Sequence, residues 1–256
     1  MSARIVLLAG RGESSHIVYN ALRKRFDIAA VVLEDPVPRL EFLNRRRKRL
    51  GLRRTIGQFW FRALAIPYLR ASSHSRIQKI LNESGLDNSR ILANAITGVP
   101  SVNCEKTVRL LRETKPDVVV VSGTRIISAE VLNSAKVPFI NLHAGITPLY
   151  RGVHGAYWAL VERDRPCCGV TVHLVDAGID TGKILGQALI APLPQDNFVT
   201  YPYLQLAAGI PVLCRAIEDA AARKFEFLPT PEGKSRLWTH PTLAEYVILR
   251  VKAGVK

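Results

Sequence analysis

The chain has 256 residues, is 48% hydrophobic and carries a net charge of +15. This length and apolar content predict one well-buried domain with a modest appendage, and they leave too little chain for two full domains. The charge calls for an anionic partner: a phosphorylated small molecule, a nucleic acid or the acidic face of a bilayer.

Signals for targeting and for cross-linking are both missing from the sequence. The apolar run after Arg4 ends at Gly10, which is too short for the core of a signal peptide or for a transmembrane segment. We therefore expect a cytoplasmic protein. The four cysteines include no C-x-x-C pair, so neither a zinc site nor a disulfide framework is expected.

The beginning of the chain predicts strands that alternate with helices. Residues 4–10 form an apolar run ended by glycine, residues 14–25 carry apolar side chains at helical spacing, and residues 28–33 form a second apolar run. These patterns predict a strand, a helix and a strand. The near-continuous apolarity of 28–33 is typical of a parallel strand that is buried on both faces.

A strongly basic segment, residues 39–72, interrupts this alternation. It contains the cationic run 45–49, then Arg53 and Arg54, with Trp60 and Phe61 close behind. Three interpretations stay open: a solvated helix face, a contact with the phosphates of a nucleotide, or attachment to a membrane surface.

The alternation resumes at residue 75. We expect helices over 75–81, 104–114, 128–134 and 155–163, and strands over 117–123 and 138–143. Residues 169–175 and 183–190 predict an antiparallel strand pair around a glycine-rich turn. A helix is expected over 198–223, followed by an irregular tail from residue 229. The pattern predicts an α/β fold with a Rossmann-like, mostly parallel sheet flanked by helices, and a short C-terminal helical and irregular extension.

Polar residues gather where the predicted strands end. Ligands of open parallel sheets bind at the carboxyl ends of the strands, and three polar clusters fall there, at 10–15, 122–125 and 141–143. Asn141 and His143 are two residues apart on a strand, so both side chains point to the same face. They can act on one reacting atom.

The residues after this pair carry a family resemblance. The N-x-H pair at 141–143 is followed by a proline-containing loop that ends in R-G at 151–152, and then by a D-x-G-x-D-x-G turn at 176–182. This order and spacing resembles the 10-formyltetrahydrofolate-dependent formyltransferases, a family that includes glycinamide ribonucleotide, methionyl-tRNA and sugar-nucleotide formyltransferases. The resemblance implies the formyltransferase fold, with a catalytic domain over 1–192, the basic segment as an insertion, and an extension over 193–256.

The resemblance also implies a catalytic set. Attack of a neutral amine on a formyl carbonyl makes a negative oxygen and a positive nitrogen, so the site needs a hydrogen-bond donor, a proton handler and an anion. By resemblance, Asn141 polarises the formyl oxygen, His143 holds the oxyanion or moves protons, and Asp180 orients His143 and assists proton transfer. His173 is interpreted as structural, and His154 stays undecided. No metal is implied, because these side chains make a poor zinc set.

Two binding regions follow from the same resemblance. The pocket for 10-formyltetrahydrofolate is expected to comprise Gly123, Thr124, Arg125, Ile126, Ile127, Val175, Asp176, Ala177 and Gly178. The turn at 10–15 resembles a phosphate cradle at a helix N-terminus, although Glu13 would repel phosphate. The residues expected to bind the acceptor are Gly10, Gly12, Ser14, Ser15, Tyr150, Arg151 and Gly152.

The acceptor is expected to be a small anionic amine. An amino-sugar nucleotide is preferred over glycinamide ribonucleotide, because the 10–15 turn departs from the G-S-N turn usual in the purine enzymes. Family members that act on tRNA have a C-terminal β-barrel domain, for which too few residues follow Ile190, so tRNA is not expected. Two other functions stay open: hydrolysis of the formylfolate by water, and a noncatalytic nucleic-acid-binding module. Peripheral membrane contact and homodimer formation also stay open.

Overall fold

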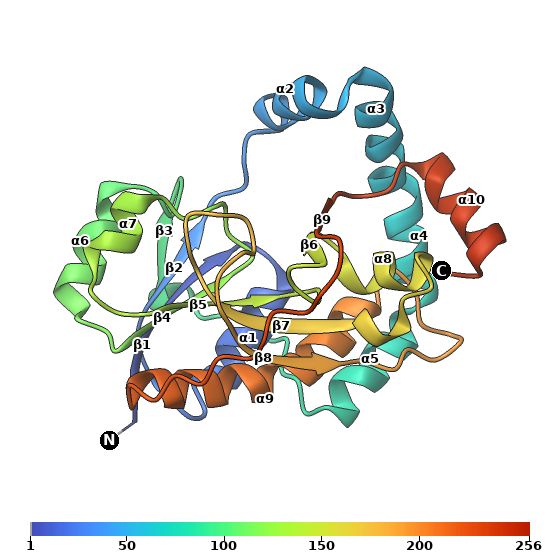
Figure 1. Cartoon of the computed structure of the whole chain (residues 1–256). Coiled ribbons are helices and arrows are strands. Elements are labelled where there is room, and N and C mark those ends of the chain that lie inside the picture. Colours follow the sequence, from blue (N-terminus) through green and yellow to red (C-terminus); the bar gives the residue numbers. More distant parts are fainter. Residues whose placement is uncertain (1) are drawn as a thin grey trace.

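A seven-stranded sheet forms the centre of the molecule, which the computed structural model describes over residues 2–256 (Figure 1). The strand order is β3-β2-β1-β4-β5-β7-β8. Strands β1 to β5 pair in parallel, and β7 and β8 extend the sheet in antiparallel fashion, which confirms the predicted architecture. The strands are β1 (Arg4–Gly10), β2 (Asp27–Glu34), β3 (Ile96–Val99), β4 (Val118–Ser122), β5 (Phe139–His143), β7 (Gly169–Leu174) and β8 (Ile184–Leu189).

Helices cover both faces of the sheet, and the central strand β1 shows why its sequence is continuously apolar. Ile5 and Leu7 belong to the core beneath α1 and α9, whereas Val6 and Leu8 belong to a second core beneath α6 and α7. Each face therefore needs its own apolar set. These helices are α1 (Glu13–Leu22), α5 (His74–Glu83), α6 (Glu105–Thr114), α7 (Ala129–Ser134), α8 (Gly155–Val161) and α9 (Tyr201–Ala221).

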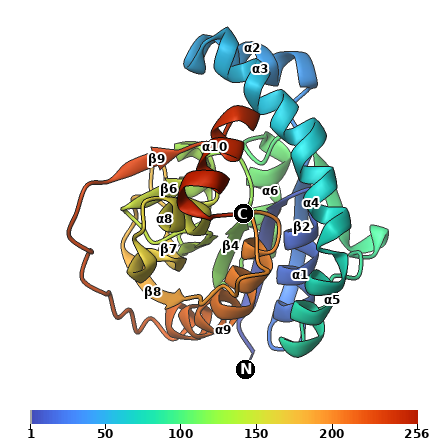
Figure 2. The same ribbon diagram turned by 90° about the vertical axis from the view of Figure 1, so that its right-hand side faces the viewer.

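The basic segment folds into a helical arm that projects from the domain (Figures 1 and 2). It consists of α2 (Arg39–Leu50), α3 (Leu52–Trp60), the π-helical turn η1 (Phe61–Ala65) and α4 (Ile66–Ser72). Helix α2 buries none of its residues. The rest of the arm is docked, since the side chain of Gln58 donates a hydrogen bond to the carbonyl oxygen of His240 at 2.5 Å.

The C-terminal tail is more ordered than predicted. Strand β9 (Arg236–Trp238) pairs in parallel with β6 (Tyr150–Gly152), and α10 (Leu243–Ala253) follows. Thr242 and Glu245 form a capping box that starts α10, a local signal that the irregular-tail prediction overlooked. The pairing of β9 with β6 joins segments far apart in the chain, so no local pattern announces it.

The extension is not separate from the main domain. Helix α9, which lies within 193–256, packs directly against β7 and β8. Across residues 2–256, none of the helices combines the length and the apolarity that a bilayer span requires.

Candidate active site

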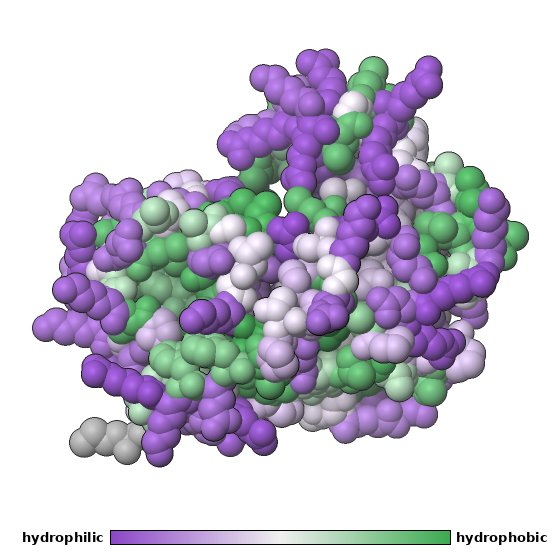
Figure 3. Space-filling model, in the orientation of Figure 1, coloured by the Kyte–Doolittle hydropathy of each residue, from purple (hydrophilic) through white to green (hydrophobic). Residues whose placement is uncertain are grey.

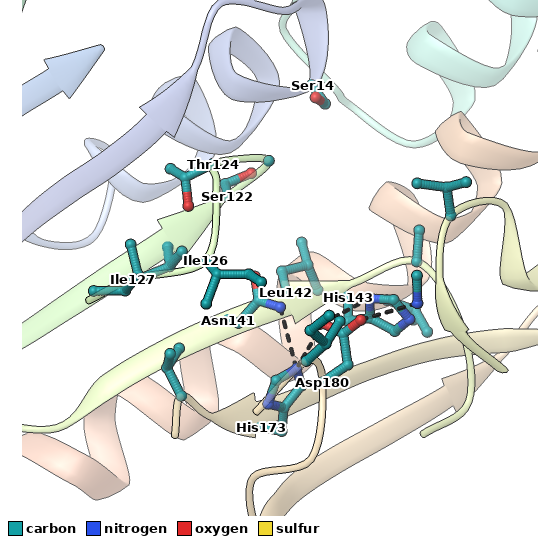
Figure 4. Close-up of a pocket in the computed structure, with 18 of the residues that line it drawn as sticks. Ser14, Ser122, Thr124, Ile126, Ile127, Asn141, Leu142, His143, His173 and Asp180 are labelled. Carbon is teal, nitrogen blue, oxygen red and sulfur yellow. Dashed lines mark hydrogen bonds and ion pairs between the residues drawn. The ribbon is translucent and has the colours of Figure 1, made fainter. Parts of the chain in front are cut away.

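A pocket of about 510 Å³ lies where β4 and β5 end and where the turn after β7 returns (Figure 4). The fold thus brings the end of β4, the N-x-H pair and the Asp-rich turn to one edge of the sheet, as the sequence predicts. Its lining includes Ser14, residues 121–127, 141–144 and 152–154, His173, Val175, Asp176 and residues 178–180.

Asn141 is held in place by His173, a residue interpreted as structural from the sequence. The Asn141 amide nitrogen lies 3.1 Å from His173 Nε2, and His173 Nδ1 lies 2.8 Å from the carbonyl oxygen of Leu174. An amide nitrogen only donates hydrogen bonds and a carbonyl oxygen only accepts them. His173 Nδ1 therefore donates to Leu174, and His173 Nε2 accepts from Asn141. This bond uses one amide N–H and leaves the second for a ligand.

The position of His173 follows from strand register. In the antiparallel pair of β5 and β7, Asn141 lies directly opposite His173. The alternation of β7 in the sequence indicates which residues share a face, but it does not give the register against β5. His173 therefore joins the site through a pairing that the sequence does not reveal.

His143 and Asp180 form the second half of the centre. His143 Nε2 lies 2.9 Å from the carbonyl oxygen of Tyr150 and therefore carries the proton that it donates. His143 Nδ1 lies 3.3 Å from Asp180 Oδ1. Burial lowers the pKa of His143, and this effect outweighs the opposing charge of Asp180. The neutral imidazole thus turns an unprotonated nitrogen toward the carboxyl group.

The Asp180 carboxyl group is ionised in this setting. Burial alone would raise its pKa, but the interactions that the carboxylate makes with neighbouring groups, among them the backbone N–H of Gly152, outweigh that effect and lower it. The Gly152 N–H donates to Asp180 Oδ2 at 3.0 Å. Asp180 itself has φ of 52°, in the left-handed region that non-glycine residues seldom adopt, so the turn is held by its surroundings.

Arg151 and Gly152, predicted to bind the acceptor, support this turn. Arg151 Nη1 donates to the carbonyl oxygen of Ile179 at 3.2 Å, and Arg151 Nε donates to Ser235. Gly152 pairs with Trp238 across β6 and β9, and a side chain at Gly152 would collide with the Trp238 carbonyl oxygen. Only Gly152 of the two lines the pocket.

The predicted folate-binding residues all line the pocket except Ala177. The Asp176 carboxylate accepts hydrogen bonds from the Gly178 N–H at 3.0 Å and from the Thr181 hydroxyl group at 2.8 Å, which fixes the turn. The Arg125 side chain points elsewhere: it donates to the carbonyl oxygens of Pro100 and Asp35. The Arg125 charge is therefore engaged by these carbonyl oxygens, although the residue lines the pocket.

The residues predicted for the acceptor are scattered. Ser14 lines the pocket on the side away from Asn141 and Asp180 (Figure 4). The Ser15 hydroxyl group is buried and donates to the Gly10 carbonyl oxygen.

Three more of the residues predicted to bind the acceptor do not line the pocket. Gly12 caps α1 but does not line the pocket, and Gly10 touches the backbone of Gly123. Tyr150 is buried, with its hydroxyl group donating to Asp164.

Two arginines of the basic segment, Arg46 and Arg62, form a cationic border beyond His154, which lines the pocket. The His154 ring packs 4.7 Å from the His240 ring, and burial lowers the pKa of His154 to about 3, with the charge of Arg62 acting in the same direction. Arg46 and Arg62 both stack on the Phe42 ring, at 4.7 and 5.6 Å. Burial lowers the pKa of Arg46, and the charge of Arg62 adds to this.

The potential metal ligands in the described part of the chain do not form a metal-binding group. Within residues 2–256, no three His, Cys, Asp or Glu side chains are arranged to hold a metal ion. The four cysteines are unpaired thiols, and burial raises the pKa of Cys168 to about 12. The polar chemistry of the site therefore rests on Asn141, His143, His173 and Asp180.

Residues 86–207 match the family described as formyl transferase, and this region contains the whole of that polar set. This part of the chain therefore resembles the formyltransferase family. Among curated proteins it is similar to methionyl-tRNA formyltransferases of Chlorobium chlorochromatii, 32% identical over 53% of this chain and 43% of the relative, and Clostridium beijerinckii, 39% identical over 51% and 42%. The chain thus spans less than half the length of these relatives.

Solved structures share the fold along most of the chain. A glycinamide ribonucleotide transformylase of Symbiobacterium toebii aligns with a TM-score of 0.55 at 19% identity, covering 87% of this chain and 89% of the other. A sugar N-formyltransferase of a Shewanella species aligns with a TM-score of 0.53 at 16% identity, covering 96% and 86%. At such identities the likeness establishes the fold.

Proposed function

We propose that this protein transfers the formyl group of 10-formyltetrahydrofolate to the amine of a small anionic acceptor, with an amino-sugar nucleotide as the preferred acceptor. The observation that carries the proposal is the arrangement of Asn141, His143, His173 and Asp180 at one end of the pocket. It provides an oriented amide donor and an unprotonated acceptor of protons within one site.

The pocket suits a flat, largely apolar donor. Its volume of about 510 Å³ falls within the usual range for small-molecule sites. Apolar side chains such as Ile127, Leu142 and Val175 line it, together with residues 123–126 of the loop after β4. These residues are the ones we propose to hold the pterin.

The polar set accounts for the movement of charge during transfer. Attack by the amine nitrogen on the formyl carbon forms a C–N bond and places negative charge on the formyl oxygen, which the second N–H of Asn141 is available to bind. The new ammonium must lose a proton. His143 Nδ1 and Asp180 Oδ1 face each other at 3.3 Å with no proton between them, so a proton taken up there completes a hydrogen bond. The formyl carbonyl then re-forms as the bond to the folate nitrogen breaks, and that nitrogen takes the proton held between His143 and Asp180 and leaves as tetrahydrofolate.

The cationic border beside His154 favours a phosphorylated acceptor. Two carboxylates in contact with arginines of the arm are already paired, Glu41 with Arg45 and Glu245 with Arg54. Arg46 and Arg62 stack on Phe42 and are available to an anion. We therefore propose that the acceptor phosphates lie toward these two arginines.

A second candidate acceptor is methionyl-tRNA. The curated relatives that match about half of this chain carry that activity in their names, and the basic arm would suit a nucleic acid. Glycinamide ribonucleotide is a third candidate, because a transformylase for it shares the fold.

The test is an acceptor panel with purified protein and 10-formyltetrahydrofolate, read by the absorbance of released tetrahydrofolate. The panel contains amino-sugar nucleotides, glycinamide ribonucleotide, methionyl-tRNA and no acceptor. We expect turnover with an amino-sugar nucleotide and a loss of at least about a hundredfold in Asn141→Ala. Formate release without acceptor would identify a hydrolase. If none of the acceptors in the panel gives turnover, or if Asn141→Ala keeps wild-type turnover, the proposal is wrong.

A further inference from the structure

The helical arm presents a stripe of apolar side chains to solvent. Leu52, Ile56, Phe59, Trp60, Leu64 and Tyr68 are all exposed, from 47% for Ile56 to 67% for Tyr68. They recur every three to four residues through α3, η1 and α4, so they run along one side of the arm. We call these six residues the apolar stripe.

Packing of the domain does not account for the apolar stripe. The arm already has an inward side, formed by Thr55, Gln58, Phe61, Ala65 and Leu69, all of which are buried. The stripe lies on the other side. An arm with apolar residues on both sides has a second surface to cover, since contiguous exposed apolar patches of this kind mark interaction sites.

The same arm carries a dense positive charge. Residues 39–72 contain ten arginines and lysines and a single acidic residue, Glu41, which pairs with Arg45. Arg47, Lys48 and Arg49 are exposed in the last turn of α2. In Figure 3 the projecting arm shows hydrophilic purple side chains beside green apolar ones.

Helix α10 adds a second apolar surface next to the arm. It packs against α3 and η1 and leaves Val247, Ile248 and Val251 exposed. Arg250 and Lys252 lie on the same helix. The pairing of exposed aliphatic side chains with cations is thus repeated on a neighbouring element.

Charge and apolarity together select the partner. A nucleic acid would neutralise the cations but would leave the apolar stripe in water. A second copy of the chain would cover the stripe but would bring two strongly cationic arms together. An anionic bilayer accepts both, because Trp and Tyr favour its interface and Arg and Lys reach the headgroup phosphates while their alkyl stems stay in the apolar zone.

We propose that the apolar stripe and the cations of α2 bind the surface of an anionic phospholipid bilayer. The arm lies in the interface with the stripe toward the acyl chains, and no helix crosses the membrane. This binding is independent of the formyl-transfer chemistry, because the stripe contributes nothing to the lining of the pocket.

The experiment is co-sedimentation of the full chain with vesicles of phosphatidylcholine alone or of phosphatidylcholine with phosphatidylglycerol. We expect binding to the phosphatidylglycerol vesicles that weakens with added salt. The double substitution Phe59→Ser, Leu64→Ser should lower the partition coefficient by at least about tenfold, because two apolar side chains that the bilayer would bury are lost. Replacing Arg47, Lys48 and Arg49 by Gln should also weaken it by at least about tenfold.

Leu92→Ser is the control, since Leu92 is an exposed leucine outside residues 39–72 and outside the apolar stripe. It should bind vesicles like the wild type, and circular dichroism should show that all variants fold. Absence of binding to phosphatidylglycerol vesicles would overturn the proposal.

Two other results would also overturn it. Salt-sensitive RNA binding without vesicle binding would assign the cations to a nucleic acid. If the wild type is a dimer that does not bind vesicles, and the Phe59→Ser, Leu64→Ser variant is a monomer, the stripe belongs to an interface with a second copy.

Discussion

Replacement of Asp180 by Asn tests the proton-accepting role most directly, because it keeps the shape of the side chain and removes its charge. At 3.3 Å from His143 Nδ1, a full carboxylate charge stabilises a protonated imidazole by at most about 5 kcal/mol at an effective dielectric constant of ~20. One factor of ten in rate corresponds to about 1.4 kcal/mol, and the Asn dipole retains part of the interaction. We therefore expect kcat to fall between about 10²-fold and 10⁴-fold.

The assay is steady-state turnover over a pH series, with thermal unfolding as the control for folding. In the wild type the active pair is ionised Asp180 with neutral His143, and both pKa values lie below their ordinary values. Activity should hold as the pH falls from neutral to below the ordinary imidazole value of 6.5 and should then decline. In Asp180→Asn the charge that raises the His143 pKa is gone, so the decline should move to lower pH.

Asp176→Asn provides the comparison within the same turn. The Asp176 carboxylate contacts Gly178 and Thr181 and no catalytic side chain, so its loss should act mainly on the KM for the folate. If Asp180→Asn turns over within tenfold of the wild type, or if Asp176→Asn is the more damaged of the two in kcat, the proton-accepting assignment is incorrect.

Three further predictions concern other contacts. His173→Ala should lower kcat by at least about tenfold with little change in the KM for the folate, because Asn141 loses its orienting bond; an unchanged kcat would return His173 to a structural role. Arg46→Gln should raise the KM for a phosphorylated acceptor about three- to tenfold, an effect that added salt mimics, and leave the folate KM unchanged; equal changes in both KM values would contradict this. Asp196→Ala should lower the free energy of unfolding by about 3 kcal/mol, because it removes the buried partner of the partly covered Arg76 guanidinium. The pKa of Asp196 is lowered, since Arg76 outweighs burial, so its contribution is present above pH 3.8 and lost as pH falls below that value; denaturant titrations at several pH values measure both effects.

The sequence by itself predicted six of the seven strands of the main sheet and the shared face of Asn141 and His143. Continuous apolar runs such as 4–10 and 28–33 identified buried parallel strands, because both faces of such a strand lie in a core. The two-residue spacing of Asn141 and His143 placed both on one face, since the period of a strand is a local property. The loop and turn motifs that surround them carry the resemblance to the formyltransferases.

Only the tertiary structure decided how the site is completed. His173 reaches Asn141 through the register of β7 against β5, and Gly152 reaches Asp180 through a loop held by the distant strand β9. Backbone pairing of this kind depends on which segments meet in space, and a slip of one residue changes the partner without changing the local pattern. The basic arm is a second example. Its charge is evident in the sequence, but only the structure shows that one side of its helices is packed and that the apolar stripe on the other side is exposed.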